Sequence, residues 1–129
     1  MTSTPLPNSA LVVDDETVSR LVLSHMLRRA GWDVTEADDV APAIALARSG
    51  TFTAIFSDFS MPGGTGVDLL DALPPTPARP LFVLVTGIVE HSSVGLDLAS
   101  MIDGHLIKPI SSRALSECLA AILPRQRDR

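Results

Sequence analysis

Short apolar runs, separated by longer segments with helical periodicity, restrict the fold of this sequence more than any other feature does. Four of the runs show no alternation of polar and apolar residues, at positions 10–13, 54–56, 81–85 and 106–107. Runs of this kind are typical of parallel strands that are covered on both faces of a sheet. A fifth, more polar run at positions 33–36 fits a strand at the edge of the sheet.

Helical periodicity fills the intervals between the runs. The first interval has an apolar stripe, which we expect to pack on the sheet, and a polar opposite side. The stripe consists of Val18, Leu21, Val22 and Met26, and the opposite side of Arg20, Ser24 and Arg28. Further helices are expected near positions 40–47, 67–73, 91–101 and 115–122, and the last of these is expected to end at Pro124.

Strand and helix therefore alternate five times along the chain, with strands beginning near positions 10, 33, 53, 81 and 105. This alternation predicts an α/β fold with a parallel sheet and right-handed crossover connections. In sheets of this type the ligand site lies beyond the carboxyl ends of the central strands.

Charged and hydroxyl residues stand at the ends of four expected strands. Asp14 and Asp15 follow the first strand, Asp58 the third, Thr86 the fourth and Lys108 the fifth. Singly, each is typical of a helix cap or a turn. Together, three carboxylates would repel one another unless a divalent cation and the lysine compensate. Magnesium binds carboxylate and phosphate oxygens, and an aspartate can serve as a nucleophile that forms an aspartyl-phosphate. The rim therefore has the groups needed for phosphoryl transfer to a carboxylate.

The motifs at this rim, at positions 12–16, 57–62, 85–87 and 108–109, together resemble the receiver domain of bacterial response regulators. The resemblance extends from about position 9 to position 122, and the motifs occur in the family's order and at its spacing. It implies a (βα)5 doubly wound domain with a five-stranded parallel sheet in the flavodoxin-like strand order 2-1-3-4-5.

The resemblance implies a role for each residue of the acidic cluster. Asp58 would be the phosphoacceptor. Asp14 and Asp15 would be the acidic pair that holds Mg²⁺, with Asp15 the more direct ligand. Asp58 and the backbone carbonyl of Ser60 would complete the protein ligands of the metal.

The remaining roles concern the phosphoryl group. Thr86 would be the hydroxyl that contacts this group and moves on activation. Lys108 would pair with the phosphate, and the peptide bond between Lys108 and Pro109 would be cis. Gly66 matches the family's glycine before the third helix.

Three positions depart from the family pattern. The residue three before the lysine, which is usually Tyr or Phe, is His105 here, so the usual aromatic switch is in question. His105 either still couples to Thr86 or is an exposed strand residue without a switching role. The residue after the threonine is Gly87 instead of Ala, and Thr65 replaces the acid that usually precedes the conserved glycine. None of these changes removes a catalytic atom.

Composition narrows the class of protein further. The sequence has 10 basic and 15 acidic residues and a formal charge of −5, which argues against nucleic acid as a partner. Its single cysteine allows no internal disulfide. No segment has the roughly 18 apolar residues of a membrane span, and the N-terminus is unlike a signal peptide. We therefore expect a cytoplasmic protein with one domain over residues 9–124, between an N-terminal tail at 1–8 and a C-terminal tail at 125–129.

The sequence favours a signalling switch over two other functions. A histidine kinase or a histidine phosphotransfer protein would place a phosphoryl group on Asp58. The altered surface would then bind an output partner, which the sequence does not identify, or a second copy in a phosphorylation-dependent homodimer. Such a receiver is not an enzyme beyond its own phosphorylation and dephosphorylation. The alternatives are a magnesium-dependent phosphohydrolase with an aspartyl-phosphate intermediate and a receiver fold that binds partners without phosphorylation.

Overall fold

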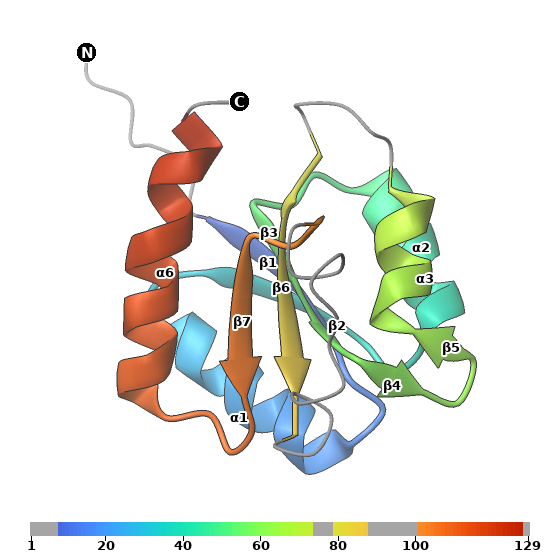
Figure 1. The fold of residues 1–129 in the computed structure, drawn as a ribbon, viewed down its shortest axis with the longest axis horizontal. Helices are drawn as coiled ribbons and strands as arrows, with labels where there is room; N and C mark the ends of the chain where they lie inside the picture. Colours follow the sequence, from blue (N-terminus) through green and yellow to red (C-terminus); the bar gives the residue numbers. More distant parts are fainter. Residues whose placement is uncertain (1–7, 74–78, 88–100, 128–129) are drawn as a thin grey trace.

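The computed structural model describes residues 8–73, 79–87 and 101–127, and its main feature is a five-stranded parallel sheet (Figure 1). The strands lie in the order β2-β1-β3-β6-β7. Their bounds are Ser9–Val13 for β1, Asp33–Ala37 for β2, Ala54–Asp58 for β3, Leu81–Thr86 for β6 and Gly104–Ile107 for β7. Because β4 and β5 form a separate small hairpin, this is the order 2-1-3-4-5 within the sheet, and the predicted α/β fold class is confirmed.

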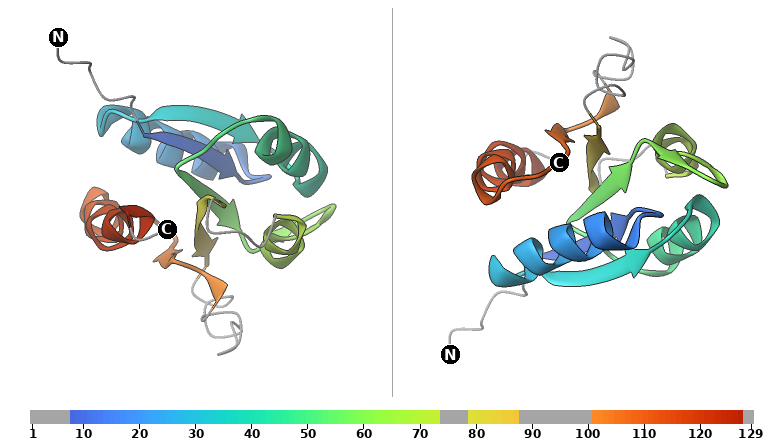
Figure 2. Two further views of the ribbon diagram at one scale, coloured as in Figure 1. Left: turned by 90° about the horizontal axis from the view of Figure 1, so that it is seen from above. Right: turned by 90° about the horizontal axis from the view of Figure 1, so that it is seen from below.

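Helices cover both faces of the sheet (Figure 2). On one face, α1 and α6 share an apolar cluster with the sheet, and on the other face α2 and α3 share a second cluster. The helix bounds are Thr17–Arg29 for α1, Val40–Ser49 for α2, Gly66–Ala72 for α3 and Ser112–Arg127 for α6. The helix expected near positions 91–101 lies outside the described residues except for Met101. None of the helices in the described ranges is long and apolar enough to cross a membrane.

The central strands have unbroken apolar runs because successive side chains point to opposite faces of the sheet, and both faces are covered by an apolar cluster. In β1, Ala10 and Val12 pack toward α1 and α6, while Leu11 and Val13 pack toward α2 and α3. Strand β2 lies at the edge of the sheet: among the described strands it pairs with β1 alone, and it is more exposed, as its polar sequence predicts. On the α1 and α6 side, the buried ring of Trp32 meets Phe56 edge-on, with ring centroids 6.1 Å apart.

Helix α1 contradicts the predicted stripe. Its buried residues are Leu23, Ser24 and Leu27, whereas Val18, Leu21 and Val22 are 71%, 50% and 44% exposed. The helix carries apolar side chains around most of its circumference, so periodicity alone allowed two orientations. The contacts of α1 with β1 and β2 select the orientation in which Leu23 and Leu27 enter the core.

Two further local features differ from the sequence-based expectation. Helix α6 continues past Pro124 to Arg127, so the prediction that it ends at Pro124 is wrong. Proline removes one backbone donor, but this loss falls near the end of a helix whose apolar face is already buried through Leu115, Leu119 and Ile122. The antiparallel hairpin of β4 (Ser60–Met61) and β5 (Gly64–Thr65) was not expected from the sequence.

Candidate functional site

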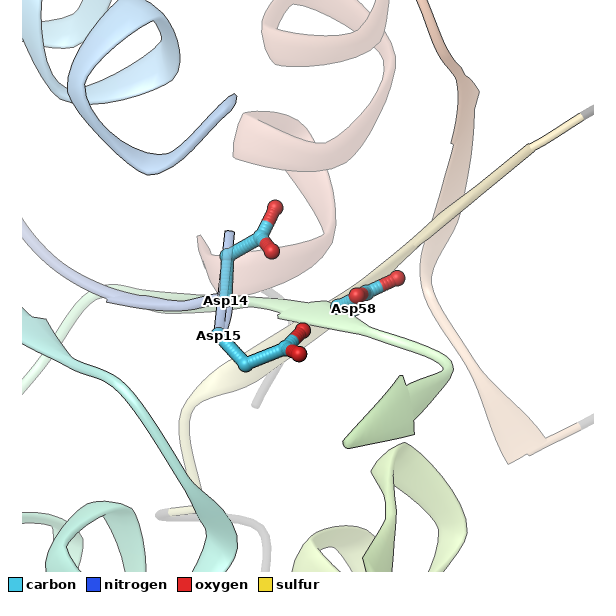
Figure 3. Close-up of side chains that lie close together, drawn as sticks. All are labelled: Asp14, Asp15 and Asp58. Carbon is cyan, nitrogen blue, oxygen red and sulfur yellow. The ribbon is translucent and has the colours of Figure 1, made fainter. Parts of the chain in front are cut away.

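Three carboxylates meet at the carboxyl ends of β1 and β3 (Figure 3). Val13 pairs with Ser57 in the parallel ladder, so the next residues, Asp14 and Asp58, leave the two strands side by side. One oxygen from each of Asp14, Asp15 and Asp58 lies within 4.8 Å of the others. Asp14 and Asp58 are buried, whereas Asp15 is exposed, so the cluster opens to solvent on the Asp15 side.

Backbone hydrogen bonds hold the two buried carboxylates in place. The backbone N–H of Glu16 donates to Asp14 Oδ1 at 2.9 Å, and the backbone N–H of Phe59 donates to Asp58 Oδ1 at 2.9 Å. The backbone of Asp14 is itself tied to the edge strand, because its N–H donates to the carbonyl of Ala37 at 3.1 Å. Both side chains therefore have a defined direction without help from a ligand.

Lys108 supplies the cation of the cluster. Its Nζ lies 3.0 Å from Asp14 Oδ2 and 3.5 Å from Asp58 Oδ1. Burial alone would lower the pKa of Lys108, but the hydrogen bond with Asp14 and the charges of Asp58, Asp14 and Glu16 outweigh it, so the pKa is raised. The ammonium group is thus held in its charged form between two buried carboxylates. The Lys108–Pro109 peptide bond is cis.

Thr86 is the last residue of β6, one position past Val85, which pairs with Asp58. Its side chain is fully buried, and its hydroxyl lies 2.8 Å from Nε2 of His105 on the neighbouring strand β7. The backbone N–H of Lys108 donates to the carbonyl of Thr86 at 2.7 Å, which ties the ends of β6 and β7 together. His105 is thus a half-buried residue in contact with Thr86, and its switching role stays a prediction.

Close backbone packing surrounds Asp58 on the α3 side. The backbone N–H of Gly66 donates to the carbonyl of Phe59 at 2.8 Å, and a Cβ on Gly66 would lie only 2.8 Å from the carbonyl oxygen of Asp58. Thr65, at the position where the family usually has an acid, begins α3 in a capping box with Asp68. Ser60, whose carbonyl was assigned to the metal by resemblance, is the exposed first residue of β4, and its role stays a prediction.

Arg20 belongs to the surroundings of the site and was missed by the sequence analysis, which placed it on the polar side of α1. Its guanidinium donates to the backbone carbonyl of Asp14 at 2.9 Å and to Glu36 Oε1 at 3.1 Å. Arg20 therefore links the start of α1 to the end of β1 and to β2, and it holds the turn that carries the acidic pair. Its position in the first turn of the helix after Asp15 could have predicted this contact, because a long cationic side chain there can reach back to the backbone at the end of β1.

The donor set fits a magnesium ion. All three side chains offer carboxylate oxygens, which are the ligands that hard divalent cations prefer. Magnesium is usually bound through one or two carboxylates and keeps several waters, which suits a cluster with one solvent-exposed acid. A divalent cation would also offset the repulsion among three acids that Lys108 alone does not neutralise.

Comparisons with known proteins agree with this geometry. A sequence profile of the response regulator receiver domain family matches residues 10–120. The chain is 33% identical over 118 residues to the chemotaxis protein CheY of Pseudomonas aeruginosa, covering 89% of this chain and 95% of that protein. It is 35% identical over 121 residues to the probable transcriptional regulatory protein TcrX of Mycobacterium tuberculosis, covering 92% of this chain but only 51% of that protein.

Solved structures show the same fold. A CheY-like response regulator receiver domain from Methylobacillus flagellatus superposes with a TM-score of 0.82, covering 91% of this chain and 99% of that one, at 23% sequence identity. The family profile spans most of the chain, and the solved receiver domain has the same fold. The chain therefore belongs to the response regulator receiver domain family of two-component systems.

Proposed function

We propose that Asp58 accepts a phosphoryl group and that the protein acts as a phosphorylation-dependent switch. The observation that carries this proposal is the arrangement of a buried Asp58 carboxylate beside Asp14, Asp15 and Lys108 at the carboxyl end of the central strand β3. A carboxylate oxygen of Asp58 attacks the phosphorus of a donor phosphoryl group, and the bond from phosphorus to the donor atom breaks. The product is an aspartyl-phosphate on Asp58.

The neighbouring residues have distinct roles in this proposal. Asp14 and Asp15, with Asp58 and the carbonyl of Ser60, would hold Mg²⁺, which supplies positive charge to the phosphoryl oxygens when bound. Lys108 already contacts Asp58 and is held in its charged form, so it can pair with a phosphoryl oxygen without first gaining a proton.

The donor in this proposal is a phosphohistidine on a histidine kinase or a histidine phosphotransfer protein. The similarity to a chemotaxis protein and to a transcriptional regulatory protein supports a place in such a relay. Phosphorylation would change the surface at the ends of β6 and β7, because Thr86 and Lys108 lie there. A partner or a second copy of the chain would recognise that surface.

Phosphorylation with acetyl phosphate and Mg²⁺ tests the assignment of Asp58. Intact-mass spectrometry should show one added phosphoryl group on the wild type and none on Asp58→Asn. Asp33→Asn is a matched control, because Asp33 is an exposed acid at the start of β2 and should leave the labelling unchanged. Equal labelling of wild type and Asp58→Asn would refute the proposal.

Thermal melting tests the metal site separately. Mg²⁺ that binds only the folded protein should raise its free energy of unfolding, by about 2.7 kcal/mol when the free ion is at 100 times its Kd. Asp15→Ala removes the exposed carboxylate of the cluster and should abolish most of this gain. A wild type that does not respond to millimolar Mg²⁺, or an Asp15→Ala variant that responds equally, would contradict a metal site at these residues.

A further inference from the structure

Thr86 and His105 are placed side by side by the register of two neighbouring strands. His105 pairs with Leu84 and Thr86 pairs with Ile107, so His105 and Thr86 are diagonal neighbours. Leu106 enters the cluster under α6, so the adjacent His105 points to the opposite face of β7. Thr86 points to the same face of β6, because its neighbour Val85 also enters the cluster under α6. The two polar side chains meet there at 2.8 Å.

The contact limits what the Thr86 hydroxyl can do, because a hydroxyl has only one proton to donate. If Thr86 donates to an unprotonated Nε2 of His105, its proton is not available to a phosphoryl oxygen on Asp58. If Nε2 carries a proton, His105 donates to Thr86 Oγ1, and the hydroxyl proton is free for the phosphoryl group. Thr86 is fully buried, so bulk solvent does not reach its hydroxyl.

We propose that His105 is a positioning residue for Thr86: its Nε2 accepts a hydrogen bond from the hydroxyl before phosphorylation, and afterwards it carries a proton that comes from Nδ1 by tautomer exchange or from solvent. The inference rests on the proposed phosphorylation of Asp58. A phosphoryl group that draws the Thr86 proton toward itself leaves the Thr86 oxygen as an acceptor for Nε2–H. Phosphorylation therefore favours the forms of His105 that are protonated at Nε2, including the cation, and raises its pKa.

Linkage gives the direction of the pH effect. Because the phosphorylated state has the higher His105 pKa, it binds more protons, and it becomes more favourable as the pH falls through the range near 6.5 in which histidine ordinarily titrates. The affinity of the site for a phosphoryl group should be higher at a pH below both His105 pKa values than at a pH above both. The gain is about tenfold for each unit by which phosphorylation raises the pKa. The wild type would thus be a receiver that is easier to activate in mildly acidic conditions.

Charged groups on β7 and the elements around it also affect the titration of His105 through their electric field. On β7 and its ends these are Asp103, whose Oδ2 accepts from the backbone N–H of Phe82 at 2.9 Å, and Lys108. Glu117 on α6 lies on the other side of β7 from the His105 side chain and forms an ion pair with Arg113 at 3.1 Å. The charge of the phosphoryl group also acts on His105 directly, so the comparison that isolates the Thr86 hydroxyl is a variant that keeps this charge and loses the hydroxyl.

Side-chain NMR of histidine and lysine tests the inference with beryllofluoride and Mg²⁺ as the phosphoryl mimic. The Nε2 signal of His105 should change from an unprotonated to a protonated nitrogen when the mimic binds, and its apparent pKa should rise. Exposed His25 on α1 is the internal control and should not respond. Lys108, the only lysine in the sequence, reports whether the mimic occupies the site.

Three variants separate positioning from a structural role. Thr86→Val keeps the shape but removes the hydroxyl, and it should abolish the change of the His105 Nε2 signal from an unprotonated to a protonated nitrogen. Thr86→Ser restores a hydroxyl and should restore the response. His105→Phe keeps a ring without nitrogen atoms. In the wild type the affinity for the mimic should change with pH around neutrality, by roughly tenfold per unit of pKa shift. In His105→Phe this dependence on pH should be lost.

The outcomes distinguish this inference from the function on which it rests. If Lys108 responds to the mimic but the titration of His105 stays the same, the inference is overturned and the phosphoacceptor role stands. It is also overturned if Nε2 already carries the proton before the mimic binds. If neither Lys108 nor His105 responds, the proposed function fails as well.

Discussion

Lys108 offers the most direct test of what offsets the negative charge of the acidic site, because it is the cation that contacts both buried carboxylates. It is also the only lysine in the sequence. Lys108→Met keeps the aliphatic stem of the side chain and removes the ammonium group. Two carboxylates that are only 7% and 8% exposed then lose the cation that lies 3.0 Å from one and 3.5 Å from the other.

The expected loss of stability follows from this geometry. Removing one partner of a buried ion pair costs about 3–5 kcal/mol, because an uncompensated charge stays buried. The side chain of Lys108 is 22% exposed and the cluster is open beside Asp15, so water compensates in part. We therefore expect Lys108→Met to lower the free energy of unfolding by about 2–3 kcal/mol at pH 7 without metal. Mg²⁺ should reduce the difference in free energy of unfolding between wild type and Lys108→Met (the gap), because it supplies positive charge to the same carboxylates.

The gap between wild type and Lys108→Met should also depend on pH in a defined direction. The folded-state pKa of Lys108 is raised, so its stabilisation is fully present below the ordinary value of 10.5 and is lost as the pH rises through the higher folded-state value. Burial raises the pKa of the Cys118 thiol from 9.0 to about 11, which also lowers stability as the pH rises above 9. This second effect is common to both proteins and cancels in their difference.

Urea denaturation followed by Trp32 fluorescence measures the gap, because Trp32 is the only tryptophan and is buried in the core. Arg113→Met is the matched control: it removes a cation from an ion pair with Glu117 in which the side chains are 89% and 67% exposed. That variant should change stability by less than about 1 kcal/mol. A Lys108→Met variant as stable as the control, or a gap that persists unchanged well above pH 10.5, would refute the electrostatic reasoning.

Two stability predictions concern residues around the site. Ser24 is fully buried on α1, and its hydroxyl has no hydrogen-bond partner among the described residues, so Ser24→Ala should raise the free energy of unfolding by about 1–2 kcal/mol. Exposed Ser116→Ala reports helix propensity alone, and an equal gain there would contradict this explanation. Gly66→Ala places a Cβ 2.8 Å from the carbonyl oxygen of Asp58 and should lower stability by about 1–3 kcal/mol in the same urea assay. An unchanged midpoint would show that α3 can move away from β3.

The strand pattern was predictable from the sequence because burial on both faces makes most residues of a central strand apolar. Strands β3 and β6 are buried along their whole length, and their ends were marked by Asp58 and Thr86. Parallel strands end at the same edge of a sheet, so their order along the chain was enough to expect Asp14, Asp58 and Lys108 near one another. The structure brings these three together.

Helix orientation was not predictable in the same way. Helix α1 has apolar residues on both its inner and its outer side, and only its contacts with β1 and β2 decide that Leu23 enters the core while Val18 is exposed. The same rotation brings Arg20, which looked like a surface residue, against the backbone of Asp14. Periodicity measures how apolar residues are spaced, but it does not say which of two apolar sides meets the sheet.

The sequence by itself determined the α/β class, the position of the acidic cluster and the family, because these depend on residue types at the ends of buried strands. Only the tertiary structure decided which side chains touch within that framework. The contact of Thr86 with His105 depends on the register between β6 and β7, and a shift of one residue would point one of them to the other face. Register is set by packing across the whole sheet, so no local stretch of sequence contains it.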